Sequence, residues 1–128
     1  MKSERGAAAV EFALVLVPLV LLVFGIINFG WAFSVWTEMA GGVREGARVM
    51  AVTGDAANAK SRTVDMVVTA KLTSADVHVY VDGVEGAACA PNKRVTVTAK
   101  YPMPVPVAFP PFPNTWQINR TGAMPCGG

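Results

Sequence analysis

The chain has 128 residues and a formal net charge of +2 at pH 7, from 11 Lys and Arg and 9 Asp and Glu. This nearly balanced charge, with no basic stripe along any segment, does not favour a nucleic-acid-binding surface. About 52% of the residues are hydrophobic, and the length that follows the apolar N-terminal region suffices for one small domain.

The first predicted element is an apolar helix that crosses a membrane. Phe12–Trp36 holds 25 residues and no charged side chain. As a helix it would be about 37 Å long at ~1.5 Å per residue, against a bilayer hydrocarbon core of about 30 Å. Pro18 removes one backbone N–H, which a membrane-spanning helix tolerates better than a soluble one. Trp31 and Trp36, near the far end, fit either the headgroup layer or ordinary packing.

Glu11 is a charge at the start of this apolar region. A carboxylate there is unfavourable unless it finds a partner or stays near the headgroups. No Lys or Arg occurs between Ala7 and Ala40. A partner for this carboxylate must therefore come from the flank, from water or from another molecule.

The leader before the helix resembles a known processing signal. Met1–Gly6 carries Lys2 and Arg5 and ends in Gly, Glu is the fifth residue after it, and a long apolar helix follows. This pattern resembles the class III signal of type IV pilins and pseudopilins. The resemblance implies that a prepilin peptidase cuts the Gly6–Ala7 bond on the cytoplasmic side. It also implies that Glu11 sets the assembly register by attracting the N-terminal ammonium of a neighbouring subunit.

A second motif narrows the family. Val43–Arg48 reads V-R-E-G-A-R. At this distance after an apolar helix it resembles the TadE-like proteins, small pseudopilins of the tight-adherence (Flp) pilus system, as does the leader stretch G-A-A-A-V-E-F. The resemblance covers Arg5–Met50 and implies that Arg44, Glu45 and Arg48 dock a partner pseudopilin near the membrane. The residues alone equally fit a solvated helix face on which Glu45 and Arg48 pair.

The membrane helix is predicted to continue outward. An apolar stripe at helical spacing follows the span: Met39, Val43, Ala47 and Met50. Gly41–Gly42 weakens the helix locally and is a candidate bend. Gly54-Asp55 supplies a stop signal.

The remaining chain predicts one more helix and a small antiparallel sheet. Ala56–Leu72 has an apolar helical face, which is expected to hold Val64, Val67, Val68 and Leu72. Val77–Val81 and Val95–Tyr101 alternate with period two and predict paired strands, with a turn at Asp82-Gly83. Thr115–Thr121 is a candidate third strand.

Pro102–Pro113 contains six prolines in twelve residues, with apolar side chains between them, Phe109 and Phe112 included. Proline cannot donate a hydrogen bond to a central strand, so this segment is expected at an edge or in an extended loop. Its apolar side chains either cover the sheet or form a surface that binds a partner or rests on lipid.

Cys89 and Cys126 are the only two cysteines. They are expected to form a disulfide, which an oxidising compartment outside the cytoplasmic membrane would preserve, and two unpaired thiols are the alternative.

No motif predicts catalysis. The single histidine, His78, lies inside a strand pattern, and two cysteines with one histidine do not make a zinc site. The acidic residues lack the spacing of a calcium loop or a carboxylate pair. We therefore expect no enzyme activity, no metal, no cofactor and no small-molecule substrate.

The predicted fold class is α+β, with a long N-terminal transmembrane helix that continues into a small extracytoplasmic domain of helix and antiparallel sheet. We expect a leader at 1–6, a transmembrane and assembly helix at 7–36, and the outer domain at 37–128. Basic residues flank the span on both sides, so the peptidase resemblance decides the orientation: N-terminus in the cytoplasm, single pass through the inner membrane.

The resemblance implies a minor pilin that assists assembly or secretion of an adhesive pilus. Its implied partners are membrane lipid, prepilin peptidase, other pilins or pseudopilins and the pilus assembly machinery. The alternative is a membrane-anchored extracytoplasmic binding domain that uses the proline-rich segment. A third possibility is a secreted domain released from a cleaved signal peptide.

Overall fold

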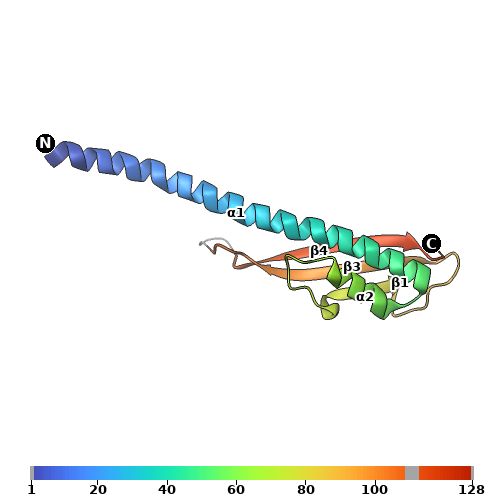
Figure 1. Cartoon of the computed structure of the whole chain (residues 1–128). Coiled ribbons are helices and arrows are strands. Elements are labelled where there is room, and N and C mark those ends of the chain that lie inside the picture. Colours follow the sequence, from blue (N-terminus) through green and yellow to red (C-terminus); the bar gives the residue numbers. More distant parts are fainter. Residues whose placement is uncertain (1, 109–112, 128) are drawn as a thin grey trace.

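The structure is a computed structural model that describes residues 2–108 and 113–127. Its helices are α1 (Lys2–Thr53), α2 (Ala56–Asp65) and the short 3-10 turn η1 (Ser74–Asp76). Its strands are β1 (Val77–Val81), β2 (Val84–Glu85), β3 (Arg94–Pro104) and β4 (Thr115–Pro125). This arrangement confirms the predicted α+β class with a long N-terminal helix, and Figure 1 shows the helix extending far beyond the domain.

Helix α1 is one continuous element of 52 residues with two different surroundings. Its N-terminal half extends beyond the domain, and its C-terminal half lies along the sheet (Figure 1). In the second half the side chains on one stripe are buried: Val35, Met39, Val43, Ala47 and Met50. The helix runs through Pro18 and through Gly41–Gly42 without a break. It ends at Thr53, where Gly54 takes a φ of +69° that favours glycine.

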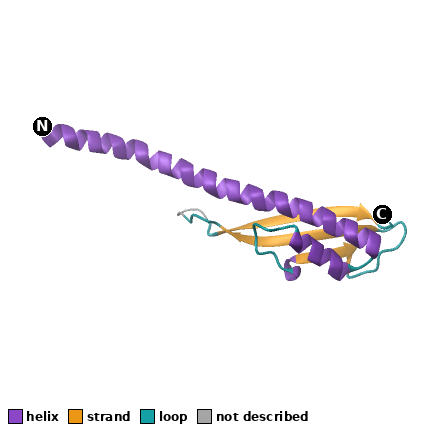
Figure 2. Cartoon of the chain, viewed as in Figure 1, coloured by secondary structure: helices purple, strands orange, loops and turns teal. Residues whose placement is uncertain are grey.

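The strands form one antiparallel sheet in the order β2-β1-β3-β4. Val79 pairs with Val97, and Val97 pairs with Gly122, so alternate residues share a face. That face is covered by both helices, as Figure 2 shows, and its valines on β1 and β3 are buried. The two predicted strands and the turn at Asp82-Gly83 are confirmed. Strand β4 confirms the candidate strand at Thr115 and extends it to Pro125.

The predicted helix Ala56–Leu72 was wrong in its extent, because α2 ends at Asp65. Its start is well capped, since the Asp55 carboxylate accepts from two backbone N–H groups. After Asp65 the chain turns tightly, with the Val67 N–H donating to the Val64 carbonyl at 3.0 Å. The Thr69 N–H and hydroxyl then donate to the carboxylate of Glu38 on α1, which draws the chain away from the helical path.

The predicted apolar face of that helix was also wrong at one position. Val67 and Leu72 are buried, but Val68 is 82% exposed, because it lies in the irregular segment where helical spacing no longer applies.

The proline-rich segment begins as part of β3. Pro102 and Pro104 pair with β4, but β1 pairs only as far as Ala99, so these prolines have a neighbour on one side. This is the edge position that proline requires. Met103 and Val105 are buried, whereas Phe109 and Phe112 lie outside the described residues.

Three glycines allow the backbone elements to approach closely. A Cβ at Gly46 would overlap the Thr63 hydroxyl of α2 and lie 3.0 Å from the Ala59 carbonyl oxygen. One at Gly42 would lie 2.8 Å from the Thr63 carbonyl oxygen, and one at Gly122 of β4 would lie 2.7 Å from the carbonyl oxygen of Val43. Both α2 and β4 therefore pack directly against the backbone of α1.

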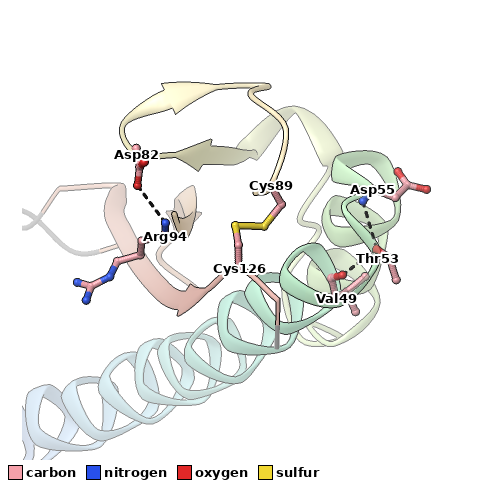
Figure 3. The surroundings of a disulfide bond; sticks show 7 residues. All are labelled: Val49, Thr53, Asp55, Asp82, Cys89, Arg94 and Cys126. Atoms are coloured by element: carbon pink, nitrogen blue, oxygen red, sulfur yellow. Dashed lines mark hydrogen bonds between the residues drawn. A yellow bond between two sulfur atoms is a disulfide. The ribbon is translucent and has the colours of Figure 1, made fainter. Parts of the chain in front are cut away.

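A disulfide joins Cys89, in the loop after β2, to Cys126, which follows β4 (Figure 3). The Cα atoms are 5.6 Å apart, and the bridge closes a loop with a sequence separation of 37. In the chain-entropy model such a loop contributes roughly 4 kcal/mol to the free energy of unfolding. Next to it, the Gly127 N–H donates to the Ala51 carbonyl at 3.0 Å, which ties the chain end to α1.

We predict that Gly46→Ala lowers the free energy of unfolding by about 1–3 kcal/mol, because the added methyl overpacks the contact with α2. Gly41→Ala is the matched control in the same helix, since its Cβ would meet nothing within 4 Å. It should leave stability unchanged or raise it by up to about 1 kcal/mol. Denaturant unfolding of the full chain in detergent, followed by near-ultraviolet circular dichroism, measures both. Equal stability of the two variants would contradict the close contact.

Candidate membrane and assembly interface

The first half of α1 presents apolar side chains without a protein partner among the described residues. From Glu4 to Val23 every residue is exposed, and several large side chains are more than half exposed: Val10, Phe12, Leu14, Val15, Val17, Leu19, Leu22 and Ile26. Within the described part of the chain, α1 is the one helix long and apolar enough to cross a membrane. The arrangement fits a single-pass membrane anchor.

The predicted processing and register residues lie on this free half. Gly6, Ala7 and Glu11 are exposed and helical, and Glu11 forms no ion pair with a described side chain. Ala7 and Glu11 are four residues apart, which places them on the same face of the helix, about 6 Å apart along its axis. Cleavage at Gly6–Ala7 and a register role for Glu11 stay predictions.

Asn28 of α1 bonds to the segment that connects β3 and β4. Its side-chain Nδ2 donates to the Val107 carbonyl at 2.9 Å, and its Oδ1 accepts from the Val107 N–H at 3.0 Å. This pair of hydrogen bonds ties the end of the β3–β4 hairpin to the helix. The domain therefore lies beside the last part of the predicted span, 28–36.

An apolar groove of about 360 Å³ lies between α1 and β4 at this level. Its main lining side chains are Phe29, Phe33, Trp36, Trp116 and Ile118. The three aromatic rings of α1 stack in sequence, with centroid distances of 6.5 and 6.1 Å. The groove thus continues the apolar surface of the free helix into the domain.

Arg120 of β4 lies beside Trp36, one of the residues that line this groove. Its guanidinium carbon is 3.9 Å from the centroid of a Trp36 ring, a cation–π contact. Its Nε is buried and has no hydrogen-bond partner among the described residues. A positive charge therefore borders an apolar groove and makes no ion pair with a described carboxylate.

The V-R-E-G-A-R stretch is paired largely within the chain. The Arg48 guanidinium donates to both carboxylate oxygens of Glu45 at 2.9 Å, and Arg62 of α2 lies 3.8 Å from Glu45. The hydrogen bond from Arg48 holds the pKa of Glu45 below its usual value. This geometry is the paired helix face that the residues alone suggest. Docking of a partner on Arg44, Glu45 and Arg48 stays a prediction.

Sequence reasoning missed several side chains that define this region. Asn28 is the one amide in the apolar run Phe12–Trp36, and an isolated polar residue in such a run is itself a signal for a partner. The contacts of Glu38 with Thr69 and of Arg120 with Trp36 join residues far apart in sequence. No local sequence pattern predicts these two contacts.

The fold is that of an α+β protein in which one long helix fits a single-pass membrane anchor and also forms part of the domain core. A family model described as TadE-like protein matches residues 6–48, which confirms the resemblance to the TadE-like family over that segment. The match supports a protein associated with the tight-adherence pilus. Neither the curated proteins nor the solved structures contain a significant match.

We predict that Asn28→Leu loosens the end of the hairpin, because it removes both hydrogen bonds to Val107. A hydrogen bond contributes about 1 kcal/mol, so amide exchange at Val107 should quicken roughly fivefold or more. The control is Thr37→Val, since the Thr37 hydroxyl bonds only to the Phe33 carbonyl of its own helix. Hydrogen–deuterium exchange by mass spectrometry is the measurement, and unchanged exchange at Val107 in Asn28→Leu would show that the amide does not hold the hairpin.

Proposed function

We propose that the chain is a TadE-like pseudopilin, a minor pilin that assists assembly or secretion of the tight-adherence pilus after processing by a prepilin peptidase. The observation that carries this proposal is the family match at residues 6–48. That segment includes the Gly of the leader, Glu11, the apolar helix and the V-R-E-G-A-R stretch. The free half of α1 supports the proposal, because it is exposed on all sides and available to neighbouring helices.

Assembly by such a protein is a physical process. Leader removal at Gly6–Ala7 would create an ammonium at Ala7 that does not exist in the precursor. In a bundle of similar helices, Glu11 of one subunit would attract the ammonium of the next, because charges in a low-dielectric layer are stabilised by a close countercharge. The contact would fix the axial register of neighbouring subunits, while apolar side chains exchange lipid for one another.

The proposed orientation places the leader in the cytoplasm and the domain on the outer face of the inner membrane. The disulfide supports this orientation, since such bonds persist in oxidising compartments. In this arrangement α1 transmits displacement of its membrane half directly to the domain, because its second half is part of the core.

A membrane-anchored binding domain is the second candidate, and the apolar groove at Phe33 and Trp116 favours it. In that case the helix would serve only as an anchor. Gly6 and Glu11 would then be dispensable, and another transmembrane helix could replace residues 7–36.

We predict that the mature protein from its native membrane begins at Ala7, as determined by intact mass and N-terminal sequencing. Gly6→Leu should block cleavage and leave the leader attached. Gly30→Leu is the matched control, since a Cβ there meets nothing within 4 Å, and it should be processed normally. A native chain that begins at Met1 would contradict pseudopilin processing, and a start beyond Phe33 would indicate a cleaved secretory signal instead.

We predict that Glu11→Ala leaves membrane insertion intact but reduces pilus assembly at least tenfold, because the ammonium of the neighbour loses its countercharge. Glu4→Ala is the control, since this carboxylate lies in the segment that the peptidase would discard. Membrane fractionation measures insertion, and sheared surface pili measure assembly. Normal assembly by Glu11→Ala would remove the register role of Glu11.

A further inference from the structure

The depth of the domain relative to the bilayer follows from the geometry of α1. This step rests on the proposed single-pass span. If Glu11 lies at the inner polar boundary, a hydrocarbon core of about 30 Å ends roughly 20 residues later at ~1.5 Å per residue. That position is Trp31, which is 42% exposed and typical of the headgroup boundary.

In this arrangement the loop that connects β3 and β4 lies at the outer boundary of the hydrocarbon core or on its hydrocarbon side. Val107 is bonded to Asn28, three residues before Trp31, and Trp116 lines the groove beside Phe29. Phe29 is 69% exposed and, in this arrangement, lies at the level of the lipid acyl chains. The groove is therefore continuous with the lipid-facing surface of α1 and opens into the outer leaflet.

The charge of Arg120, which lies beside the groove residue Trp36, is at headgroup depth in this arrangement. Trp36 is five residues beyond Trp31, about 7.5 Å further along the helix, and the headgroup layer is roughly 5–8 Å thick on each side. The guanidinium of Arg120 lies over Trp36, and its buried Nε has no hydrogen-bond partner among the described residues. Its charge is not paired with a described carboxylate. A lipid phosphate is the anion found at this depth, and guanidinium binds phosphate well.

We propose that the groove between α1 and β4 holds one phospholipid of the outer leaflet. An acyl chain lies against Phe29, Phe33 and Trp116, and the phosphate lies at the guanidinium of Arg120. This lipid is a second contact between the domain and the membrane, separate from the membrane-spanning helix. It fixes the tilt of the domain and its distance from the bilayer centre.

The first test places a single tryptophan in the groove. In the full chain, Trp31→Phe and Trp36→Phe leave Trp116 as the sole tryptophan, and phenylalanine at position 36 keeps an aromatic ring in the groove and beneath Arg120. The protein is reconstituted in vesicles of phosphatidylcholine and phosphatidylglycerol whose acyl chains are brominated. Fluorescence of Trp116 should fall at least twofold relative to unbrominated vesicles, and aqueous iodide should have little effect.

Two outcomes would overturn the proposal. Quenching by iodide but not by brominated lipid would place the hairpin in water, clear of the bilayer. Protection from both quenchers would show that a protein segment, such as the helix of a second copy, fills the groove. The readout does not depend on leader removal or on pilus assembly, so the pseudopilin proposal can fail while this one stands.

The second test concerns the phosphate. Phospholipid retained by the full chain through detergent washing, counted by native mass spectrometry, should fall at least fivefold in Arg120→Gln. Lys100→Gln is the control, since it removes one positive charge from an exposed position on β3, on the opposite face of the sheet. Equal retention by the two variants would overturn the role of Arg120.

Discussion

The packing of α1 against the valine face of the sheet is the interaction on which the remaining structure depends. Val35, Met39, Val43, Ala47 and Met50 are buried there, and each large apolar side chain contributes about 1.5–3 kcal/mol on burial. Because α1 is continuous from Lys2 to Thr53, the domain core and the apolar first half of the helix belong to one element. Gly42 and Gly122 bring α2 and β4 close to α1, because a Cβ at either glycine would meet a backbone carbonyl oxygen, that of Thr63 or that of Val43.

Because α1 belongs to both the apolar segment and the domain, its position in the proposed membrane arrangement also sets the position of the domain. The loop between β3 and β4 is bonded to Asn28 and therefore lies at the same depth as Asn28. The apolar groove, and the Arg120 guanidinium that pairs with no described carboxylate, would both be satisfied if lipid were their neighbour. In a filament the same surface would face other subunits, so lipid and protein would compete for it. When the protein leaves the membrane for a filament, two surfaces would exchange lipid contacts for protein contacts. These surfaces are the free half of α1 and the groove.

The parts of the fold that depend on local periodicity were predictable. Spacing of three and four placed the stripe from Met39 to Met50, and alternation placed the strands at Val77–Val81 and Val95–Tyr101. Prediction failed after Asp65, where a contact with Glu38, 31 residues away from Thr69, overrides a helical pattern. The groove was unpredictable for the same reason, because its lining residues come from α1 and β4, which are far apart in the sequence. The leader and the V-R-E-G-A-R stretch could be recognised because they resemble motifs of a known family, and this recognition needs no knowledge of the fold.

If α1 passes from lipid into the core of the domain, the surroundings of its two halves must differ, and they can be measured directly. Spin labels on single cysteines at the exposed positions Val15, Leu22, Arg44 and Val52, with the full chain in vesicles, report collisions with oxygen and with a water-soluble nickel complex. We expect strong oxygen and weak nickel relaxation at Val15 and Leu22, and the reverse at Arg44 and Val52. Strong nickel relaxation at all four positions would show that α1 does not enter the bilayer.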